Sequence, residues 1–382
     1  MIPSIPSTPP HFSVNRVRIV DLPGLPIDAE VRGQRADDLL SSRAITRYAR
    51  AQAAALRLPA PYAQDTLETR LELPRFVDGC LSSAQRPVRA AAQAIGRRLG
   101  RNLGHILLTL HRGDGVNRAA RPDWTAGEWE RWAKVKRVWL GGGLVSGELG
   151  KLIVGHARAF LAEVGYAGKP QVALTAYPGA LTLLGAGRYL PATARHALCL
   201  DFGHTLVKRA CLGFRDGTLA QLHRYEPLMT NLDWLGAQRV PNPTTGRQVL
   251  DLIGDAVAKT LAACLADGRD PGADLMLSVA AYVRDGQLLG NGLYANLSTL
   301  SGDARPLLAQ AVRARSGRAL KVHLIHDGTA ACAVHAGETG AAVIIVGTAL
   351  GIGFPPADVR GLRPIAPRLD MRGNPRSISS VL

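Results

Sequence analysis

Three glycine-bearing turns each follow an apolar run of the sequence, and turns of this kind can bind phosphate groups. Glycine lets backbone N–H groups approach phosphate oxygens without a Cβ atom in the way, and threonine hydroxyls donate further hydrogen bonds. The three turns are Asp201-Phe-Gly203-His-Thr205, Gly347-Thr348-Ala-Leu-Gly351-Ile-Gly353 and Gly141-Gly142-Gly143. A single glycine turn is more often a plain connection, but three together, the first with a carboxylate, favour a phosphate site.

Asp327 stands where an apolar strand gives way to an alanine-rich helix, in the run IHDGTAACA. A carboxylate in that position can accept the proton of an attacking hydroxyl while glycine turns hold the phosphates. Aspartate is also a favoured residue at the N-cap of a helix. The spacing alone leaves the catalytic and the capping interpretations open.

Helical and extended stretches alternate along most of the chain, which predicts an α/β fold. Helices are expected within 36–56 (a pair) and at 89–110, 147–164, 246–266 and 306–316. Strands are expected at 137–140, 171–176, 276–283 and 321–325, with an antiparallel meander over 196–228 and a strand-turn-strand over 341–354. The segment 111–134 is polar and punctuated by Gly, Pro and Trp, so we expect a surface insertion there.

The composition predicts a globular protein with an excess of positive charge. The chain has 46 basic and 30 acidic residues, a formal net charge of +16. Such a surface can attract a nucleotide, a phosphorylated metabolite or a nucleic acid backbone. Scattered arginines are also what a GC-rich genome encodes on any surface, so the charge does not identify a partner.

The cysteines and the apolar runs predict a cytoplasmic protein without a membrane anchor. Five widely separated cysteines form no CxxC pair, which is typical of reduced thiols. The N-terminus lacks the basic and apolar segments of a secretory signal. The longest uncharged stretch, 341–357, is shorter than the roughly 20 apolar residues of a spanning helix and is broken by glycines and prolines.

In combination, these sequence blocks resemble the ROK family of sugar kinases. CLDFGHTLVKRACL is similar to the first phosphate motif of that family, and Lys208 stands where many members have a lysine. VIIVGTALGIGF resembles the second phosphate motif, and LIHDGTAACA resembles the block that holds the catalytic aspartate. KRVWLGGGLVSG is similar to the glycine turn beside adenosine, MLSVAAYVRDGQL to a buried strand and its turn, and DDLLSSRAITRYA to the helix with the pattern LE-x-x-x-S.

The order of the blocks differs from that of the family, because the glycine turn at 141–143 precedes the hairpin at Asp201. Joining the two ends of this chain restores the family order, and termini that lie on the surface make such a rearrangement tolerable. The resemblance therefore implies a two-lobed actin-like ATPase (ribonuclease H-like) fold, circularly permuted. We expect a larger lobe at 36–175 plus 326–360, a smaller lobe at 176–325, and irregular tails at 1–35 and 361–382.

The resemblance also implies roles for individual residues, with ATP and Mg²⁺ as cofactors. Asp327 would be the general base, and Asp201 would organise Mg²⁺ through water. The expected phosphate contacts are Gly203, Thr205, Lys208, Gly347, Thr348 and Gly351, and the adenosine contacts are Gly141, Gly142 and Gly143. The expected sugar contacts are Asp37, Asn296 and His326, the last of which replaces an asparagine of the family. The E-x-G-H turn and the CxCGxxGC motif of the family are missing from the sequence, so no structural zinc is expected.

The sequence predicts an ATP-dependent kinase that acts on a sugar or polyol. The alternative is a catalytically degenerate member that binds a nucleotide or sugar and regulates a partner, which the missing E-x-G-H turn favours. A DNA-binding repressor would need an N-terminal helix-turn-helix, which the proline-rich first 35 residues cannot supply, so nucleic acid is not an expected partner. The identity of the sugar and the formation of a homodimer are left open.

Overall fold

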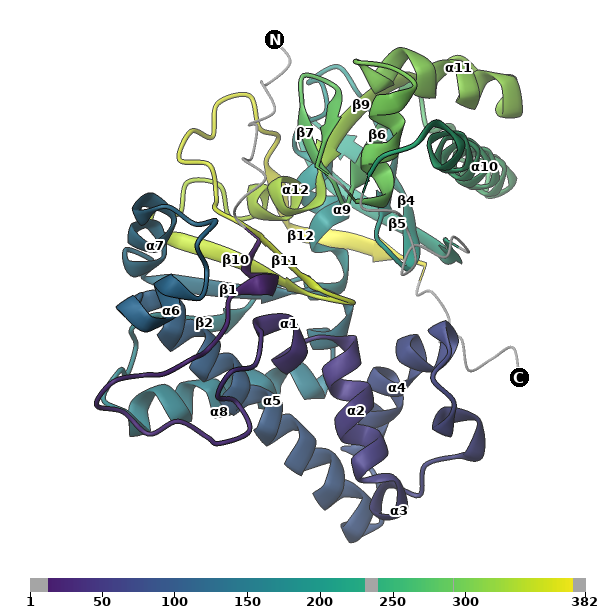
Figure 1. Cartoon of the computed structure of the whole chain (residues 1–382). Helices are drawn as coiled ribbons and strands as arrows, with labels where there is room; N and C mark the ends of the chain where they lie inside the picture. Colours follow the sequence, from purple (N-terminus) through teal and green to yellow (C-terminus); the bar gives the residue numbers. More distant parts are fainter. Residues whose placement is uncertain (1–12, 231–239, 291, 374–382) are drawn as a thin grey trace. The chain divides into compact units, whose positions relative to one another are not determined.

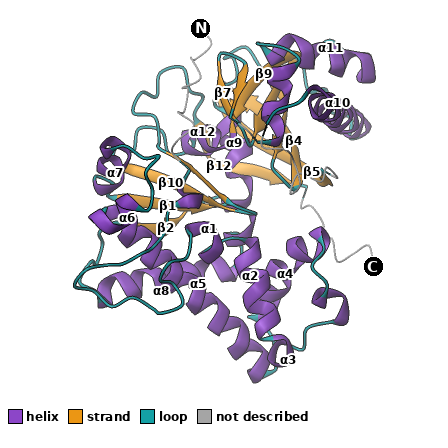
Figure 2. Ribbon diagram, viewed as in Figure 1, coloured by secondary structure: helices purple, strands orange, loops and turns teal. Residues whose placement is uncertain are grey.

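The apolar runs of the sequence form strands, and the longer periodic stretches form helices, in a computed structural model that describes residues 13–230, 240–290 and 292–373 (Figures 1 and 2). The described chain divides into two units. The N-terminal unit contains residues 13–180 and 340–354, and the C-terminal unit contains residues 181–339 and 355–373. Each unit combines helices with a mixed sheet, so the predicted α/β class is correct.

The N-terminal unit is built on a four-stranded sheet in the order β11-β10-β1-β2. Strand β1 (Arg137–Gly141) runs parallel to both β10 (Ala341–Val346) and β2 (Gln171–Leu174), and β11 (Leu350–Gly353) is antiparallel to β10. Parallel strands need a crossover between them, and the helix α8 (Glu148–Glu163) supplies it between β1 and β2. These strands lie where the sequence predicts them.

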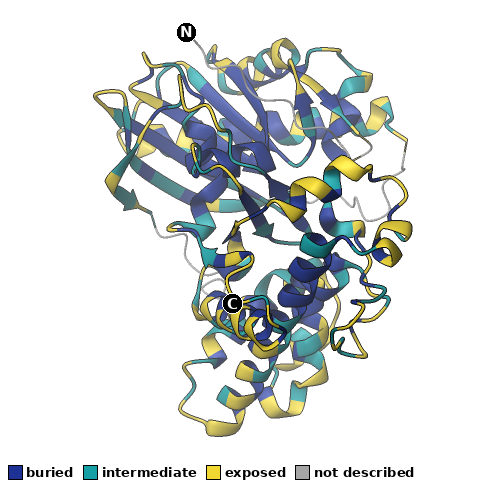
Figure 3. Cartoon of the chain, turned by 90° about the vertical axis from the view of Figure 1, so that its left-hand side faces the viewer, coloured by how far each residue is buried: buried dark blue, intermediate teal, exposed yellow. Residues whose placement is uncertain are grey.

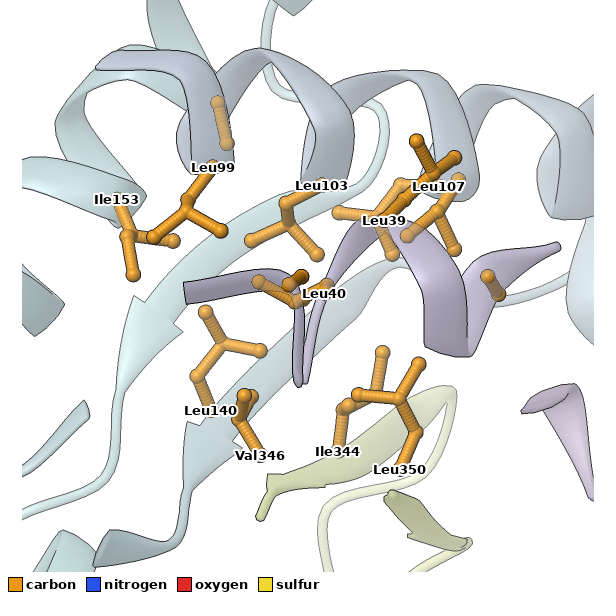
Figure 4. Close-up of a cluster of buried hydrophobic side chains, with 14 of the residues drawn as sticks. Leu39, Leu40, Leu99, Leu103, Leu107, Leu140, Ile153, Ile344, Val346 and Leu350 are labelled. Carbon is orange, nitrogen blue, oxygen red and sulfur yellow. The ribbon is translucent and has the colours of Figure 1, made fainter. Parts of the chain in front are cut away.

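Helices of the N-terminal unit bury their apolar stripes against this sheet. Leu99, Leu103 and Leu107 of α5 (Arg86–Arg112) recur every four residues and point into a buried cluster in which Leu39 and Leu40 lie between them and Leu140 of β1 and Ile344 of β10 (Figure 4). Burying one such leucine contributes about 1.5–3 kcal/mol. The remaining helices before α5 are α1 (Ala36–Leu39), α2 (Ser42–Ala51), α3 (Ala53–Leu56) and α4 (Leu67–Cys80).

Two segments expected to lie outside the core are part of it. The segment 111–134 was expected to be a surface insertion, but it forms α6 (Gly115–Ala119) and α7 (Ala126–Ala133), and α7 buries Trp129 and Trp132. Residues 1–35 were expected to be an irregular tail. Residues 1–12 lie outside the described part, whereas 13–35 begin with a short 3-10 helix, η1 (Val14–Arg16), and bury five apolar side chains: Val14, Val17, Ile19, Leu22 and Val31. Figure 3 colours the described chain by the burial of its residues.

The C-terminal unit is built on a six-stranded sheet in the order β12-β5-β4-β3-β6-β9. The meander predicted over 196–228 forms β3 (His196–Phe202), β4 (Leu206–Arg215) and β5 (Thr218–Met229), each antiparallel to the next. Beyond β3 lie two parallel strands, β6 (Asp274–Val279) and β9 (Lys321–His326). The strand expected at 276–283 is interrupted, because β7 (Tyr282–Arg284) leaves the main sheet and pairs with β8 (Gln287–Leu289).

Helices cover both faces of the six-stranded sheet. Helix α10 (Pro243–Ala266) packs on the face that carries Leu198, Leu200 and Phe202 of β3, and α11 (Ala304–Ser316) packs beside α10. The other face carries Cys199 and Asp201, because side chains alternate along a strand. It is covered by α9 (Leu181–Gly187) and α12 (Asp327–Ala333). The two helices can approach closely because Gly185 has no Cβ atom; a Cβ atom there would clash with the backbone of α12.

Two expectations about the C-terminal third are wrong. Residues 326–339 were expected in the lobe of the glycine turn at 141, but α12 packs on α9 and belongs to the C-terminal unit, as do residues 355–360. Residues 361–382 were expected to be irregular, but within the described part β12 (Ile365–Arg372) pairs with β5. Residues 374–382 lie outside the described part. None of the described helices combines the length and the apolar character needed to span a bilayer.

Candidate active site

Asp201 lies in a row of polar side chains that crosses the central strands of the C-terminal unit. It is opposite Lys208 on β4 and opposite Ser278 on β6. The Lys208 ammonium lies 2.9 Å from Oδ2 of Asp201, and the Ser278 hydroxyl donates to Oδ1 at 3.2 Å. Only 4% of Asp201 is exposed, so these two partners offset the cost of burying its carboxylate.

Asp327 follows β9 directly, at the same edge of the sheet as Asp201. The strands β3, β6 and β9 run parallel, so their carboxyl ends meet at one edge, where α/β sheets commonly bind ligands. The capping interpretation of Asp327 is wrong, because His326 is the N-cap: its Nδ1 accepts the Thr329 N–H at 3.2 Å. Asp327 is the first residue of α12, and its Oδ1 accepts the Gly328 N–H at 2.6 Å.

The environment of Asp327 favours its protonated form. Burial, with the negative charge of Asp201 as the second cause, raises the pKa of Asp327 from 3.8 to about 7. The Gly328 N–H and the Lys208 ammonium oppose this shift. A carboxyl group with a pKa near 7 can exchange a proton with a substrate at physiological pH.

The turn between β3 and β4 is held in place by a buried tyrosine. The Tyr294 hydroxyl donates to the Gly203 carbonyl at 2.7 Å, and burial, with the charges of Asp201 and Asp327, raises the pKa of Tyr294. The Gly203 N–H donates to the Leu206 carbonyl at 3.1 Å, so it closes the hairpin and does not face outward as a phosphate donor. Gly203 therefore helps to shape the turn, and its expected contact with phosphate stays a prediction.

Two further residues of this turn have different environments. Thr205 is buried, and its carbonyl accepts the Thr230 N–H at 3.2 Å. Burial lowers the pKa of His204 from 6.5 to about 4, so this ring is neutral at physiological pH. The turn therefore adds no positive charge beyond that of Lys208.

Asn296, an expected sugar contact, instead connects two elements. Its amide donates to the Leu293 carbonyl at 2.8 Å and to the Gly292 carbonyl at 3.3 Å. Its Oδ1 accepts the Asn242 N–H at 2.8 Å, at the N-cap of α10. These contacts fix the 3-10 helix η5 (Leu293–Thr299) to α10, and they occupy both ends of the amide.

The remaining predicted residues lie in the N-terminal unit, where two glycine turns are neighbours. The turn at 141–143 follows β1, and the turn at 347–349 joins β10 to β11, beside β1. Gly142 has φ +102° and ψ 165°, and a Cβ atom there would lie 2.4 Å from the Val346 carbonyl oxygen. Only glycine therefore allows the first turn to pass so close to the end of β10.

The N–H groups of these two turns are partly used inside the unit. The Gly142 N–H donates to the Pro178 carbonyl at 2.8 Å, and the Gly347 N–H donates to the Ala349 carbonyl at 3.1 Å. Thr348 stands at the tip of the β10–β11 hairpin, and Gly351 lies opposite Ile345 in the ladder. Gly141 ends β1, and Gly143 is exposed.

Asp37, the other expected sugar contact, is held by two arginines. Its Oδ2 lies 3.0 Å from the Arg43 guanidinium, and its Oδ1 lies 3.3 Å from that of Arg35. Burial raises the pKa of Asp37 although both arginines oppose the shift. The neighbouring Ser42 N–H donates to the Gly347 carbonyl at 2.9 Å, so α2 starts beside the second glycine turn.

Sequence reasoning missed three residues of the C-terminal site: Ser278, Tyr282 and Tyr294. Ser278 is a small polar residue in an apolar strand, which is a weak signal for a buried hydrogen bond. Tyr282 stacks on His326, with ring centroids 4.7 Å apart and an interplanar angle of 27°. Tyr282 begins the short strand β7, and Tyr294 lies in the 3-10 helix η5, and neither element is long enough to leave a periodic signature in the sequence.

The structure thus brings Asp201, Lys208, His326 and Asp327 together in one unit. Among the described residues, no group of three or more His, Cys, Asp and Glu side chains could hold a metal ion. A site of this kind can exchange a proton through Asp327 and attract an anion through Lys208. No protein-family model matches this sequence, and the comparison with curated proteins finds no significant match.

Proposed function

We propose that the protein is an ATP-dependent phosphotransferase that phosphorylates a hydroxyl group of a sugar or sugar-like polyol. The observation that carries this proposal is the carboxyl group of Asp327, which follows β9 and has a pKa raised to about 7 beside the charge of Asp201. General bases work best when their pKa lies near the operating pH. The sequence resemblance assigns the same residue the same role.

The chain's own residues would divide the work as follows. Asp327 accepts the hydroxyl proton while the substrate oxygen bonds to the γ-phosphorus and the bond from that phosphorus to ADP breaks. Lys208 would contribute an ammonium group that attracts the negative charge of the phosphates. Bound MgATP supplies the phosphoryl group, and Mg²⁺ is typically held by one or two carboxylates with water and phosphate oxygens. Asp201 fits a role through water, because Lys208 and Ser278 occupy its oxygens.

The second part of the proposal is that the two units are the lobes of an actin-like ATPase fold with permuted sequence order. The antiparallel meander β3-β4-β5, extended by parallel β6 and β9, is compatible with the ribonuclease H-like sheet that the resemblance implies. In the other unit, the turns at 141–143 and 347–349 would bind the nucleotide.

Nucleotide binding and turnover test this proposal in two steps. Calorimetry with ATP, with and without Mg²⁺, measures binding, and a coupled assay measures ADP release with hexoses, N-acetylated hexosamines and sedoheptulose-like sugars. Asp327→Asn should keep ATP binding and lose turnover by roughly 10²–10⁴-fold, the usual contribution of a general base. The matched control is Asp216→Asn, which changes an exposed aspartate in the β4–β5 turn. Full turnover by Asp327→Asn would refute the assignment.

A second candidate function is a regulatory protein that binds a nucleotide or sugar without phosphoryl transfer. The observation that favours it concerns two residues expected to bind the sugar, Asn296 and Asp37. The Asn296 amide is hydrogen-bonded to backbone groups, and the Asp37 carboxylate is paired with two arginines. ATP binding without ADP release for any sugar of the panel would support this function. An absence of nucleotide binding would exclude the kinase, and an absence of binding to both the nucleotide and every sugar of the panel would exclude both candidates.

A further inference from the structure

Lys208 and Asp201 form an ion pair in the candidate active site. The two residues are opposite each other on β4 and β3, and the Nζ atom of Lys208 lies 2.9 Å from Oδ2 of Asp201. The Asp201 side chain is 5% exposed, whereas that of Lys208 is 32% exposed. The carboxylate is therefore fixed inside the unit, while the ammonium group stands at the end of a flexible side chain that is partly in solvent.

Ser278 holds the other oxygen of the same carboxylate. Its hydroxyl donates to Oδ1 of Asp201 at 3.2 Å, from the neighbouring strand β6. Lys208 and Ser278 thus contact different oxygens of Asp201. Serine carries no charge, so of these two partners only Lys208 offsets the negative charge of the buried carboxylate.

The ammonium group also acts on the second carboxyl group of the site. Burial and the charge of Asp201 raise the pKa of Asp327, and the charge of Lys208 opposes this shift. Lys208 is therefore close enough to influence both carboxyl groups, and carboxylates are the side chains that attract Mg²⁺. A divalent cation beside Asp201 would compete with the ammonium group for Oδ2 and would be repelled by its charge.

We infer that Lys208 is the resident cation of Asp201: its ammonium group occupies Oδ2 and excludes a free divalent cation, which binds there only when Lys208 moves to another anion. This inference rests on the proposed function, in which the phosphates of the nucleotide are that anion. Ser278 keeps its bond to Oδ1 during the exchange, and Oδ2 becomes available to a water molecule of the hydrated Mg²⁺. One side chain thereby couples the arrival of the nucleotide to the binding of the metal.

Binding of Mn²⁺ to the full-length protein without nucleotide or sugar tests this inference. Mn²⁺ takes the same kinds of oxygen ligand as Mg²⁺, and EPR spectroscopy measures its free concentration. We expect Lys208→Met to bind Mn²⁺ at least about tenfold more tightly than the wild type, because a like charge beside the carboxylates is removed. The matched control is Lys151→Met, which removes a lysine from the exposed pair with Glu148 and should bind Mn²⁺ as the wild type does.

Two further variants locate the gained binding. Lys208→Met combined with Asp201→Asn should bind Mn²⁺ as weakly as the wild type, because the charge that attracts the metal is lost. Lys208→Arg keeps a cation opposite Asp201 and should also bind weakly. Equal binding by Lys208→Met and the wild type, or a gain that survives Asp201→Asn, would overturn the inference.

Thermal unfolding keeps the test independent of the lower stability expected for Lys208→Met. A ligand that binds only the folded protein stabilises it, so Mn²⁺ and Mg²⁺ should raise the Tm of Lys208→Met and leave that of the wild type unchanged. The wild type also provides a test without any change at position 208. Tight, saturable binding of Mn²⁺ to the wild type that is lost in Asp201→Asn would overturn the inference.

These measurements separate the inference from the proposed function. If the wild type neither binds ATP nor releases ADP but Lys208→Met gains Mn²⁺ binding, the proposed function fails and the resident cation stands. If the wild type binds ATP, ATP should tighten the binding of Mn²⁺ by a larger factor in the wild type than in Lys208→Met, which already binds the metal without the nucleotide. An equal factor in the two proteins would contradict the exchange of Lys208 from Asp201 to phosphate.

Discussion

Replacing Asp327 with asparagine should stabilise the protein at neutral pH although it removes the proposed base. The pKa of Asp327 is raised from 3.8 to about 7 in the folded chain. Between these values the folded protein holds a proton that the unfolded chain has released, so stability falls as pH rises from about 4 to about 7. Asparagine stays neutral and does not contribute to this loss.

The size of the effect follows from the shift in pKa. A difference of about three units corresponds to about 4 kcal/mol of unfolding free energy at pH above 7. The Asp327 side chain keeps 23% of its surface exposed, so we expect solvent to reduce the gain to about 2–3 kcal/mol. Near pH 4, where the folded wild type is protonated at this position, the two proteins should have almost equal stability.

Urea unfolding over the range from about pH 4 to about pH 8.5 measures this gain as a difference between variant and wild type. Titrating groups that do not interact with Asp327 contribute equally to both proteins and cancel. Asp216→Asn makes the same chemical change in the exposed β4–β5 turn and serves as the matched control. A flat difference for Asp327→Asn, or one that falls as pH rises, would refute the proposed electrostatics of the site.

Three other substitutions test particular contacts. Gly142→Ala should destabilise the N-terminal unit by more than about 2 kcal/mol in urea unfolding, because its backbone conformation excludes a Cβ atom and β10 lies against it, while Gly143→Ala should be close to neutral. Lys208→Met leaves a buried carboxylate without its cation and should lower stability by about 1–3 kcal/mol, whereas Lys151→Met, in an exposed pair, should change it by less than about 1 kcal/mol. Tyr294→Phe removes the donor to the β3–β4 turn and should lower the free energy of unfolding by about 1–2 kcal/mol, which a lower Tm would report. An unchanged Tm would show that the hydroxyl does not hold the turn.

Regular periodicity made most of the fold predictable. The apolar stripe of α5 and the apolar runs of β1, β9 and β10 are local patterns that can be recognised in the sequence. Core-facing side chains recur every three to four residues in a helix and every two residues in a strand, so the spacing indicates the type of element. The polar segment 111–134 was misread because Gly and Pro suggested a loop. The pattern Thr125-x-x-Glu128 is a capping box, and it would have indicated the start of α7.

Pairing between distant residues was less predictable. Strand β12 contains Pro367 and charged residues, which argue against a central strand but are tolerated at an edge, and its register shifts between Ile365 and Asp370. The burial of residues 13–35 depends on contacts such as that of Asn15, whose side chain pairs with both backbone groups of Leu350. Such contacts have no periodic signal in the sequence.

The site was predictable in its charged residues and not in their partners. Asp201 and Asp327 stand at strand ends, and Lys208 follows from the motif, so residue type and position identify them. The hydrogen-bond partners of these charged side chains depend on the register of the sheet and on the paths of the loops, which the sequence does not show. The hydrogen bond from the Gly203 N–H to the Leu206 carbonyl, which closes the hairpin, is likewise not visible in the sequence.

The sheet of the N-terminal unit joins strands made at very different times during synthesis. β1 ends at Gly141 and pairs with β10, which starts roughly 200 residues later, at Ala341. At about 5–20 residues per second, a ribosome needs roughly 10–40 s to cover that interval. Until then β1 has an unpaired edge, while nearly all of the C-terminal unit's main sheet has already been translated. A chain that stalls before residue 340 would therefore present an open β edge to chaperones and to other nascent chains.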